Sequence, residues 1–374
     1  MADIDTSSII QSANLKYDEG TFSDRGRSFD DARLSSKLFL DGGIASSDKA
    51  LSSTMKGLDI FNNPTPAQQT HEQHGLVFFT RPMLNLSYHN TSAEPTLTPL
   101  MTKEKVSIGA YVRAMLDPLN NLAHPDFNCP LVDRENIFIP LLSNTLETLS
   151  GWQDPMLQTW TSASGVNRQA YTLVDSTNDV FEPVDLSSTF RSVRGNILGY
   201  LFHVWQTYIG RSLQGRIDPH PAFMQYNSMD YGTRIYSLVL DQTRTYVQEI
   251  GCSGVSFPLT NPAGARLNYN REEVLNREVD TLNQTWRSMG LFYYHPGFMY
   301  DFNEASGALR PHFNDPAQRD KHYRILWPRE YKLFTYLAFP RINPRTARLE
   351  WWISREKYRQ ILGSEQYAGM PTDN

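Results

Sequence analysis

Two histidines in the stretch THEQH are the first candidates for metal chemistry. His71 and His74 lie three residues apart and would share one face of a helix, as a pair of metal ligands requires. A metal site also needs a third protein ligand, and none is identifiable from the sequence. We therefore interpret both as ordinary surface histidines and predict no metal site.

The common catalytic and cofactor motifs are absent. The sequence contains no GxGxxG, no GxxxxGK followed by Ser or Thr, no GxSxG, no HExxH and no CxxC. Two cysteines, Cys129 and Cys252, are too few for a disulfide framework, which favours a reducing site of folding. We predict that the protein is not an enzyme and has no catalytic residues and no cofactor.

Charge is distributed unevenly along the chain. The formal net charge of −5 argues against a nucleic-acid-binding protein, which needs a concentrated basic surface. Residues 61–308 carry −7, whereas residues 309–359 carry +7. This contrast predicts complementary surfaces that meet within or between subunits, with a solvated basic face as the alternative. The basic residues assigned to such contacts are Arg319, Lys321, Arg324, Arg341, Arg345 and Arg348.

Adjacent tryptophans add to this candidate interaction surface. Trp351 and Trp352 lie in the run ARLEWWI, which has the composition of a strand. Neighbouring side chains of a strand point to opposite faces, so one ring would enter a core and the other would face outward. An outward tryptophan suits a protein interface or a carbohydrate platform, and the interface is the commoner use.

The periodicity of apolar residues predicts the secondary structure. Strands are expected at 76–80, 168–176, 184–192, 233–240, 245–254, 331–340 and 347–353. Helices are expected at 106–116, 196–210, 271–290 and 354–363. The stretch 136–152 fits either a strand or a helix. In the helix at 196–210, Ile197, Leu201, Trp205 and Tyr208 form an apolar stripe, which is typical of core packing.

Three segments together resemble a known protein family. They are NIFIPLLSN, the passage VDLSSTFRSVRGNILGYLFHVWQTYI, and the hairpin TRIYSLVLDQTRTYVQEIGCSGVSFPLTNP with Gly254, Phe257 and Pro258 at its exit. In this order they resemble the tail-tube-like virion proteins of large contractile-tailed bacteriophages, over residues 76–270. The resemblance implies an α+β fold with a β-sandwich or half-barrel and one packed helix. It also implies assembly into rings, commonly hexameric, whose strands combine around a lumen.

Composition divides the chain into three parts. Residues 1–70 are rich in Ser, Asp and Gly and predict an extended polar arm that docks on another surface. Residues 71–270 are expected to form the tail-tube-like β-rich domain. Residues 271–374 are expected to form a C-terminal helix followed by a basic, aromatic α+β extension.

The resemblance implies a structural protein of the virion, assembled in the host cytoplasm. Its station would be the tail tube, a tube-initiating baseplate or a terminator, with copies of itself and other tail or baseplate proteins as partners. We expect no specific nucleic-acid recognition, and no membrane association, because no stretch approaches ~18 consecutive apolar residues. A head or neck connector is the alternative; a tail-associated hydrolase would need a carboxylate pair or nucleophile that is not identifiable.

Overall fold

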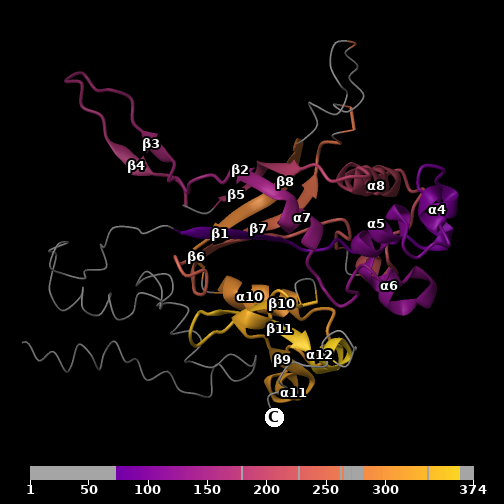
Figure 1. Ribbon diagram of the computed structural model, residues 1–374. Coiled ribbons are helices and arrows are strands. Elements are labelled where there is room, and N and C mark those ends of the chain that lie inside the picture. The colour runs from indigo at the N-terminus through magenta and orange to yellow at the C-terminus, as the bar shows by residue number, and fades with distance from the viewer. Residues whose placement is uncertain are drawn as a thin grey trace, which may run out of the picture.

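A computed structural model gives the arrangement of the chain (Figure 1). It describes residues 73–177, 180–225, 228–261, 263–264, 271, 281–295, 297–334 and 337–362. The predicted arm at residues 1–70, and His71 with it, lie outside the described residues. The described part combines α-helices with antiparallel sheets, which confirms the predicted mixture of α and β structure.

A six-stranded antiparallel sheet, curled as a half-barrel, is the centre of the fold (Figure 1). Its spatial order is β1 (His74–Phe79), β6 (Ile235–Leu240), β7 (Val247–Pro258), β8 (Thr281–Tyr293), β5 (Val180–Arg191) and β2 (Leu146–Ser150). The β6–β7 pair is the hairpin predicted from the sequence, and β1 and β5 are also predicted strands. The sheet includes β8, which follows residue 270 in the chain.

Strand β8 corrects the predicted helix at 271–290, because residues 281–290 are extended and pair with both β7 and β5. Residues 272–280 lie outside the described part. Leu282 and Trp286 are four residues apart, a spacing that fits a strand face as well as a helix face. The same buried face carries Gln284 and Ser288, so the sequence shows no apolar alternation. Ser288 Oγ is 3.1 Å from Ser256 Oγ on β7, and this cross-strand bond satisfies the buried hydroxyl.

Helix α8 (Ile197–Leu213) covers the first face of the sheet together with α5 (Ile108–Leu116). It is the predicted aromatic helix, and its first residue follows Asn196, whose φ is 53°. The Trp205 ring lies edge-on to Trp286 of β8, with centroids 5.7 Å apart. Shorter helices extend this layer: α4 (Tyr88–Ala93), α6 (Pro118–Ala123), α9 (Pro221–Gln225) and the 3₁₀ turns Thr98–Met101 and Pro125–Phe127.

The second face of the sheet is partly covered by the C-terminal region. There α10 (Gly297–Ser306) contacts β7, and Phe302 packs edge-on against Tyr236 of β6 at 5.3 Å. A small antiparallel sheet follows, in the order β10 (Phe339–Ile342), β11 (Leu349–Ser354) and β9 (Tyr323–Ile325). It is flanked by α11 (Pro316–His322), the turn Pro328–Glu330 and α12 (Arg355–Leu362). Strand β11 and helix α12 confirm the predicted strand at 347–353 and the predicted last helix. The strand predicted at 331–340 is wrong for most of its length, because residues 331–334 form turns and β10 begins only at Phe339.

The ambiguous stretch 136–152 contains one element of each kind. Pro140 begins α7 (Pro140–Thr145), where its missing amide hydrogen costs nothing, and the chain then continues directly into β2. After β2 a hairpin leaves the body, formed by β3 (Thr159–Thr161) and β4 (Thr172–Val174) (Figure 1). The predicted strand at 168–176 contains β4, whereas β3 was not predicted.

Candidate assembly surfaces

The two end strands of the central sheet, β1 and β2, offer backbone groups to a partner. Thr80 donates its amide to the Arg234 carbonyl beside β6, with N···O 3.0 Å. Amides alternate in direction along a strand, so those of Gly75 and Val77 point away from β6. Among the described residues, the only strand-type pairing on the outer side of β1 is the bridge between Thr80 and Phe138 at its end, and helix α7, which follows Phe138, also contacts β1. The outer side of β2 has no strand partner in the same part of the chain.

The predicted basic residues occupy several elements of the C-terminal region. Arg319 and Lys321 lie on α11, Arg324 on β9, Arg341 on β10, and Arg345 and Arg348 between β10 and β11. Some already have partners inside the subunit. The Arg324 guanidinium is 3.3 Å from Glu330 and 4.3 Å from the Tyr358 ring, and that of Arg319 is 5.3 Å from the Trp352 ring. Lys321 and Arg345 are exposed.

The prediction that one of the two tryptophans faces outward is wrong. Trp352 is buried against Phe313 and Phe339. Trp351 is half-buried, with its ring 6.5 Å from both Phe78 and Tyr331. The small sheet is covered on both faces. Leu349 and Trp351 of one face pack on the central sheet, and Ile353 of the same face packs on Leu326 and Phe334. Trp352, on the other face, packs on Phe313. The sequence alternation indicated the two faces of β11 correctly but not what covers them.

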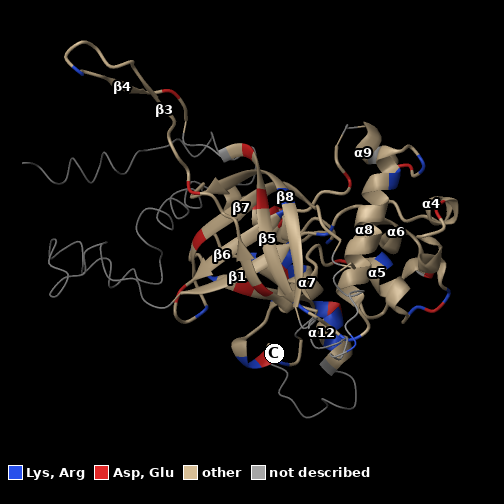
Figure 2. Cartoon of the chain, turned by 90° about the horizontal axis from the view of Figure 1, so that it is seen from above, with Lys and Arg blue, Asp and Glu red and all other residues tan. Residues whose placement is uncertain are grey.

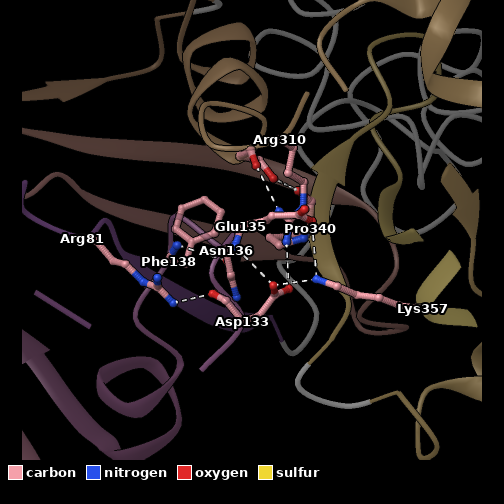
Figure 3. Close-up of polar contacts among 9 residues, drawn as sticks. Arg81, Asp133, Glu135, Asn136, Phe138, Arg310, Pro340 and Lys357 are labelled. Carbon is pink, nitrogen blue, oxygen red and sulfur yellow. Dashed lines mark hydrogen bonds and ion pairs between the residues drawn. The ribbon is translucent and has the colours of Figure 1, made fainter. Parts of the chain in front are cut away.

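A cluster of charged residues joins the C-terminal region to the body (Figure 3). Asp133, in the loop before α7, contacts Arg310 at 3.3 Å and Lys357 of α12 at 2.7 Å. Lys357 also lies 3.4 Å from Glu135, and Arg81 donates to the Asp133 carbonyl at 2.9 Å. We call these five residues the Asp133 junction. Its acidic members belong to the acidic body and two of its cations to the basic region, so the complementary charges meet within the subunit here.

Burial makes the Asp133 junction electrostatically strong. The side chains of Arg310 and Asp133 are only 1% and 4% exposed. Burial by itself raises the pKa of Asp133, but the charges of Arg310 and Lys357 outweigh this and hold it below its ordinary value. Burial lowers the pKa of Arg81 and of Arg310 to about 10, which leaves both charged at neutral pH. The Arg310 guanidinium also stacks on the Phe339 ring, 3.4 Å from its centroid.

No features of metal or membrane proteins are found in the part of the chain that the structure describes. Across the described ranges, no group of three His, Cys, Asp or Glu side chains could hold a metal ion. His74 lies in β1. No described helix is long and apolar enough to cross a bilayer. Cys129 and Cys252 are both buried free thiols.

Comparison with known families decides the class of protein. The sequence profile of a family described as "Putative phage tail tube protein" matches residues 25–368. The chain belongs to this family. Membership confirms the resemblance to tail-tube proteins that the three sequence segments indicated, and it makes the chain a virion protein of a phage tail. Among curated proteins, none matches the sequence significantly.

Two solved structures show a distant similarity to this tail tube family member. One is the cap of the anti-feeding prophage, a tube terminating cap, at 10% identity with a TM-score of 0.26, covering 42% of this chain and 81% of that chain. The other is the sheath/tube terminator of the extracellular contractile injection system PVC, at 9% identity with a TM-score of 0.24. It covers 42% of this chain and 86% of that chain. Both TM-scores are too low to support an argument, so the assignment rests on the family profile.

Proposed function

We propose that this chain is a non-enzymatic building block of a phage tail that closes into a homomeric ring, hexameric as its family resemblance implies. The observation that carries the proposal is the pair of open edges at the two ends of one curled sheet. In this ring, β1 of each subunit pairs with β2 of the next. Such head-to-tail contacts use two different surfaces and close when the rotation between subunits completes a circle.

The direction of the strands supports this pairing. The six strands alternate in direction, so β2 runs opposite to β1. A neighbouring β2 placed beside β1 therefore continues the antiparallel pattern without interruption. Exposed edge strands are a hazard for a monomer, because unpaired amides and carbonyls recruit other chains. Ring closure satisfies both edges at once and removes this hazard.

Part of the second face of the sheet would line the resulting channel. In the middle of β5 and β8 this face carries exposed or half-buried polar side chains, whereas Phe292 near the end of β8 packs on Phe298 of α10. Thr189 donates to Asn283 at 3.0 Å, and Asp185 pairs with Arg287 at 2.8 Å. The pairing cancels the two charges, so the wall offers little attraction to the phosphates of passing DNA.

The extent of the family match bears on where in the virion the ring would lie. The family match from residue 25 to 368 includes residues 25–70 of the polar arm and the basic C-terminal region, which favours the tail over the head or neck. We propose that the ring belongs to the tube, the tube-initiating baseplate or the terminator, and that it assembles in the host cytoplasm. Other tail or baseplate proteins would contact the arm and the exposed basic residues such as Lys321 and Arg345.

A proline in β1 tests the ring contact. Gly75→Pro removes only an amide that points away from β6, so the subunit keeps its own ladder, whereas the neighbouring β2 loses a donor. We expect the variant to remain folded and to lose ring formation, measured by mass photometry and electron microscopy.

Gly75→Ala is the matched control. Among the described residues, no atom lies within 4 Å of the position that a Cβ would take, and the amide is kept. The alanine variant should therefore assemble like the wild type. Rings of Gly75→Pro with wild-type stability would show that β1 is not the contact and would overturn the proposed closure.

A further inference from the structure

The β3–β4 hairpin extends away from the body on its own (Figure 1). Within the described ranges its two strands pair only with each other, and all six strand residues are exposed. Backbone hydrogen bonds nevertheless join its two sides along its length. At the base the Asp175 amide donates to the Gln158 carbonyl at 2.9 Å, and near the tip the Gly165 amide donates to the Gln169 carbonyl at 2.8 Å. Two-stranded hairpins are marginally stable in water by themselves, so a partner surface would complete this one.

The two faces of the hairpin differ in character. Trp160 lies directly opposite Leu173, and Tyr171 meets the Trp160 ring edge-on at 5.6 Å. We call these three side chains the aromatic face. Trp160 is 49% exposed, Leu173 58% and Tyr171 61%. The other face carries Thr161 and Thr172, whose hydroxyls lie 3.1 Å apart. A strand pair with one apolar and one polar face is the pattern of a half-buried sheet.

Charge on this segment is sparse. Residues 152–177 contain only Asp154, Arg168 and Asp175 as charged side chains. In Figure 2 the hairpin is almost entirely uncharged, in contrast to the body around α12. Further apolar side chains near this face, Met156, Leu157 and Val166, are each at least half exposed, whereas Val174 lies on the face of Thr161 and Thr172. Together with the aromatic face, Met156, Leu157 and Val166 form an exposed apolar surface of the kind that protein interfaces bury.

The root of the hairpin is fixed to the central sheet. Tyr293 of β8 donates its hydroxyl to the Gln153 carbonyl at 2.6 Å, and its ring meets Trp152 edge-on at 5.8 Å. The Trp152 ring lies over Gly251 of β7, 3.4 Å from the position of a Cβ at that residue. We call Trp152, Gly251 and Tyr293 the root clasp. It attaches the segment immediately after β2, the strand proposed to pair with a neighbour.

We propose that residues 152–177 form an intersubunit arm: the aromatic face of the β3–β4 hairpin packs on a second copy of this chain, and the root clasp sets its direction. A second copy is the partner because the segment continues directly from β2, so in the ring proposed above it leaves the body at the subunit boundary. A surface of aromatic and aliphatic groups with few charges is also typical of the buried centre of a lasting interface. The inference rests on the proposed ring.

Trp160→Ser tests the aromatic face, with Val174→Ser on the opposite face as the matched control. Val174 is 62% exposed and lies in the same hairpin, so both variants remove exposed apolar surface. We expect Trp160→Ser to raise the concentration needed for assembly at least about tenfold, as a tryptophan hot spot does, with an unchanged unfolding temperature. Val174→Ser should assemble nearly like the wild type. Equal assembly of Trp160→Ser and wild type would overturn the proposal.

Chemical labelling gives an independent readout. Both native cysteines are buried, so Leu173→Cys introduces a single accessible thiol on the aromatic face. Maleimide should react at least about tenfold more slowly with this thiol in assembled particles than in the dilute subunit. Equal rates in rings that do form would reject the arm and leave the ring proposal standing. A wild-type chain that never assembles would reject both.

Root-clasp variants test the positioning role. Trp152→Ala should weaken assembly, and Trp152→Phe, which keeps a ring over Gly251, should restore most of it. A merely structural tryptophan would lower the unfolding temperature without this selective effect on assembly. If Trp152→Ala assembles like the wild type, the clasp does not direct the arm.

Discussion

Replacing Trp205 by alanine should lower the free energy of unfolding by about 3–5 kcal/mol and give largely insoluble protein. The ring is fully buried between α8 and the sheet, where it meets Trp286. Its Nε1 donates to the Tyr231 carbonyl at 2.9 Å, so the substitution leaves a cavity and an acceptor without its donor. Thermal and denaturant unfolding of the soluble fraction measures the loss.

Trp160→Ala is the control for this experiment. Trp160 is half exposed on the hairpin, so its truncation should change the unfolding temperature of the dilute subunit by a few degrees at most. A Trp205→Ala protein that folds with wild-type stability but does not assemble would contradict the core position of α8. It would place that helix at a subunit contact instead.

Asp133→Asn should cost about 3–5 kcal/mol of folding free energy. The substitution keeps the shape of the side chain but removes the negative charge that compensates Arg310 and Lys357. Arg310 is almost wholly buried and would be left with an uncompensated charge. Denaturant unfolding followed at neutral pH measures the effect.

Asp185→Asn provides the matched comparison, because Asp185 also pairs with an arginine but is half exposed. An exposed pair contributes only about 0–1 kcal/mol, so this variant should unfold like the wild type. If Asp133→Asn and Asp185→Asn both lost only a small and equal amount of unfolding free energy, the Asp133 junction would not be what holds the C-terminal region to the body.

The pH dependence of this difference follows from the depressed pKa of Asp133. A carboxyl whose pKa is lower in the folded than in the unfolded state stabilises the fold above its unfolded pKa. That contribution is lost as the pH falls through the folded value. The stability gap between wild type and Asp133→Asn should therefore be constant near neutrality and should narrow below about pH 4.

Local patterns in the sequence predicted much of the fold. The stripe of Ile197, Leu201, Trp205 and Tyr208 indicated α8, because spacing on one helix decides which side chains are buried together. Alternation likewise indicated β5, whose Val184, Leu186, Ser188 and Phe190 share one buried face. The hairpin β6–β7 was predicted from two β-rich runs joined by a short connection, and β11 from the run 347–353, whereas most of the strand predicted at 331–340 forms turns where it is described.

Features that depend on contacts between distant residues were not predicted. Strand β8 places Gln284 and Ser288 on a buried face, so its sequence lacks an apolar alternation. Ser288 bonds to Ser256 of β7, and Gln284 donates to the Thr285 carbonyl of its own strand. Asp133 has no sequence signal that separates it from a solvated aspartate. Its role depends on Arg310 and Lys357, which lie 177 and 224 residues later in the chain. Only the charge contrast between body and C-terminal region hinted at such a contact.

The open sheet edges and the exposed β3–β4 hairpin are the two features through which we propose that the chain assembles. Both belong to one subunit, and each offers a group of atoms that another copy of the chain would satisfy. The edges offer backbone amides and carbonyls, and the hairpin offers an aromatic face. The contributions of the two features to assembly can be separated, because Gly75→Pro alters the sheet edge at β1 and Trp160→Ser alters the aromatic face of the hairpin.

Cryo-electron microscopy of the purified full-length chain at high concentration tests the central claim most directly. The account predicts closed rings in which β1 of each subunit continues the sheet of its neighbour through β2. A chain that stays monomeric under these conditions would contradict it, as would rings in which both edge strands remain in solvent.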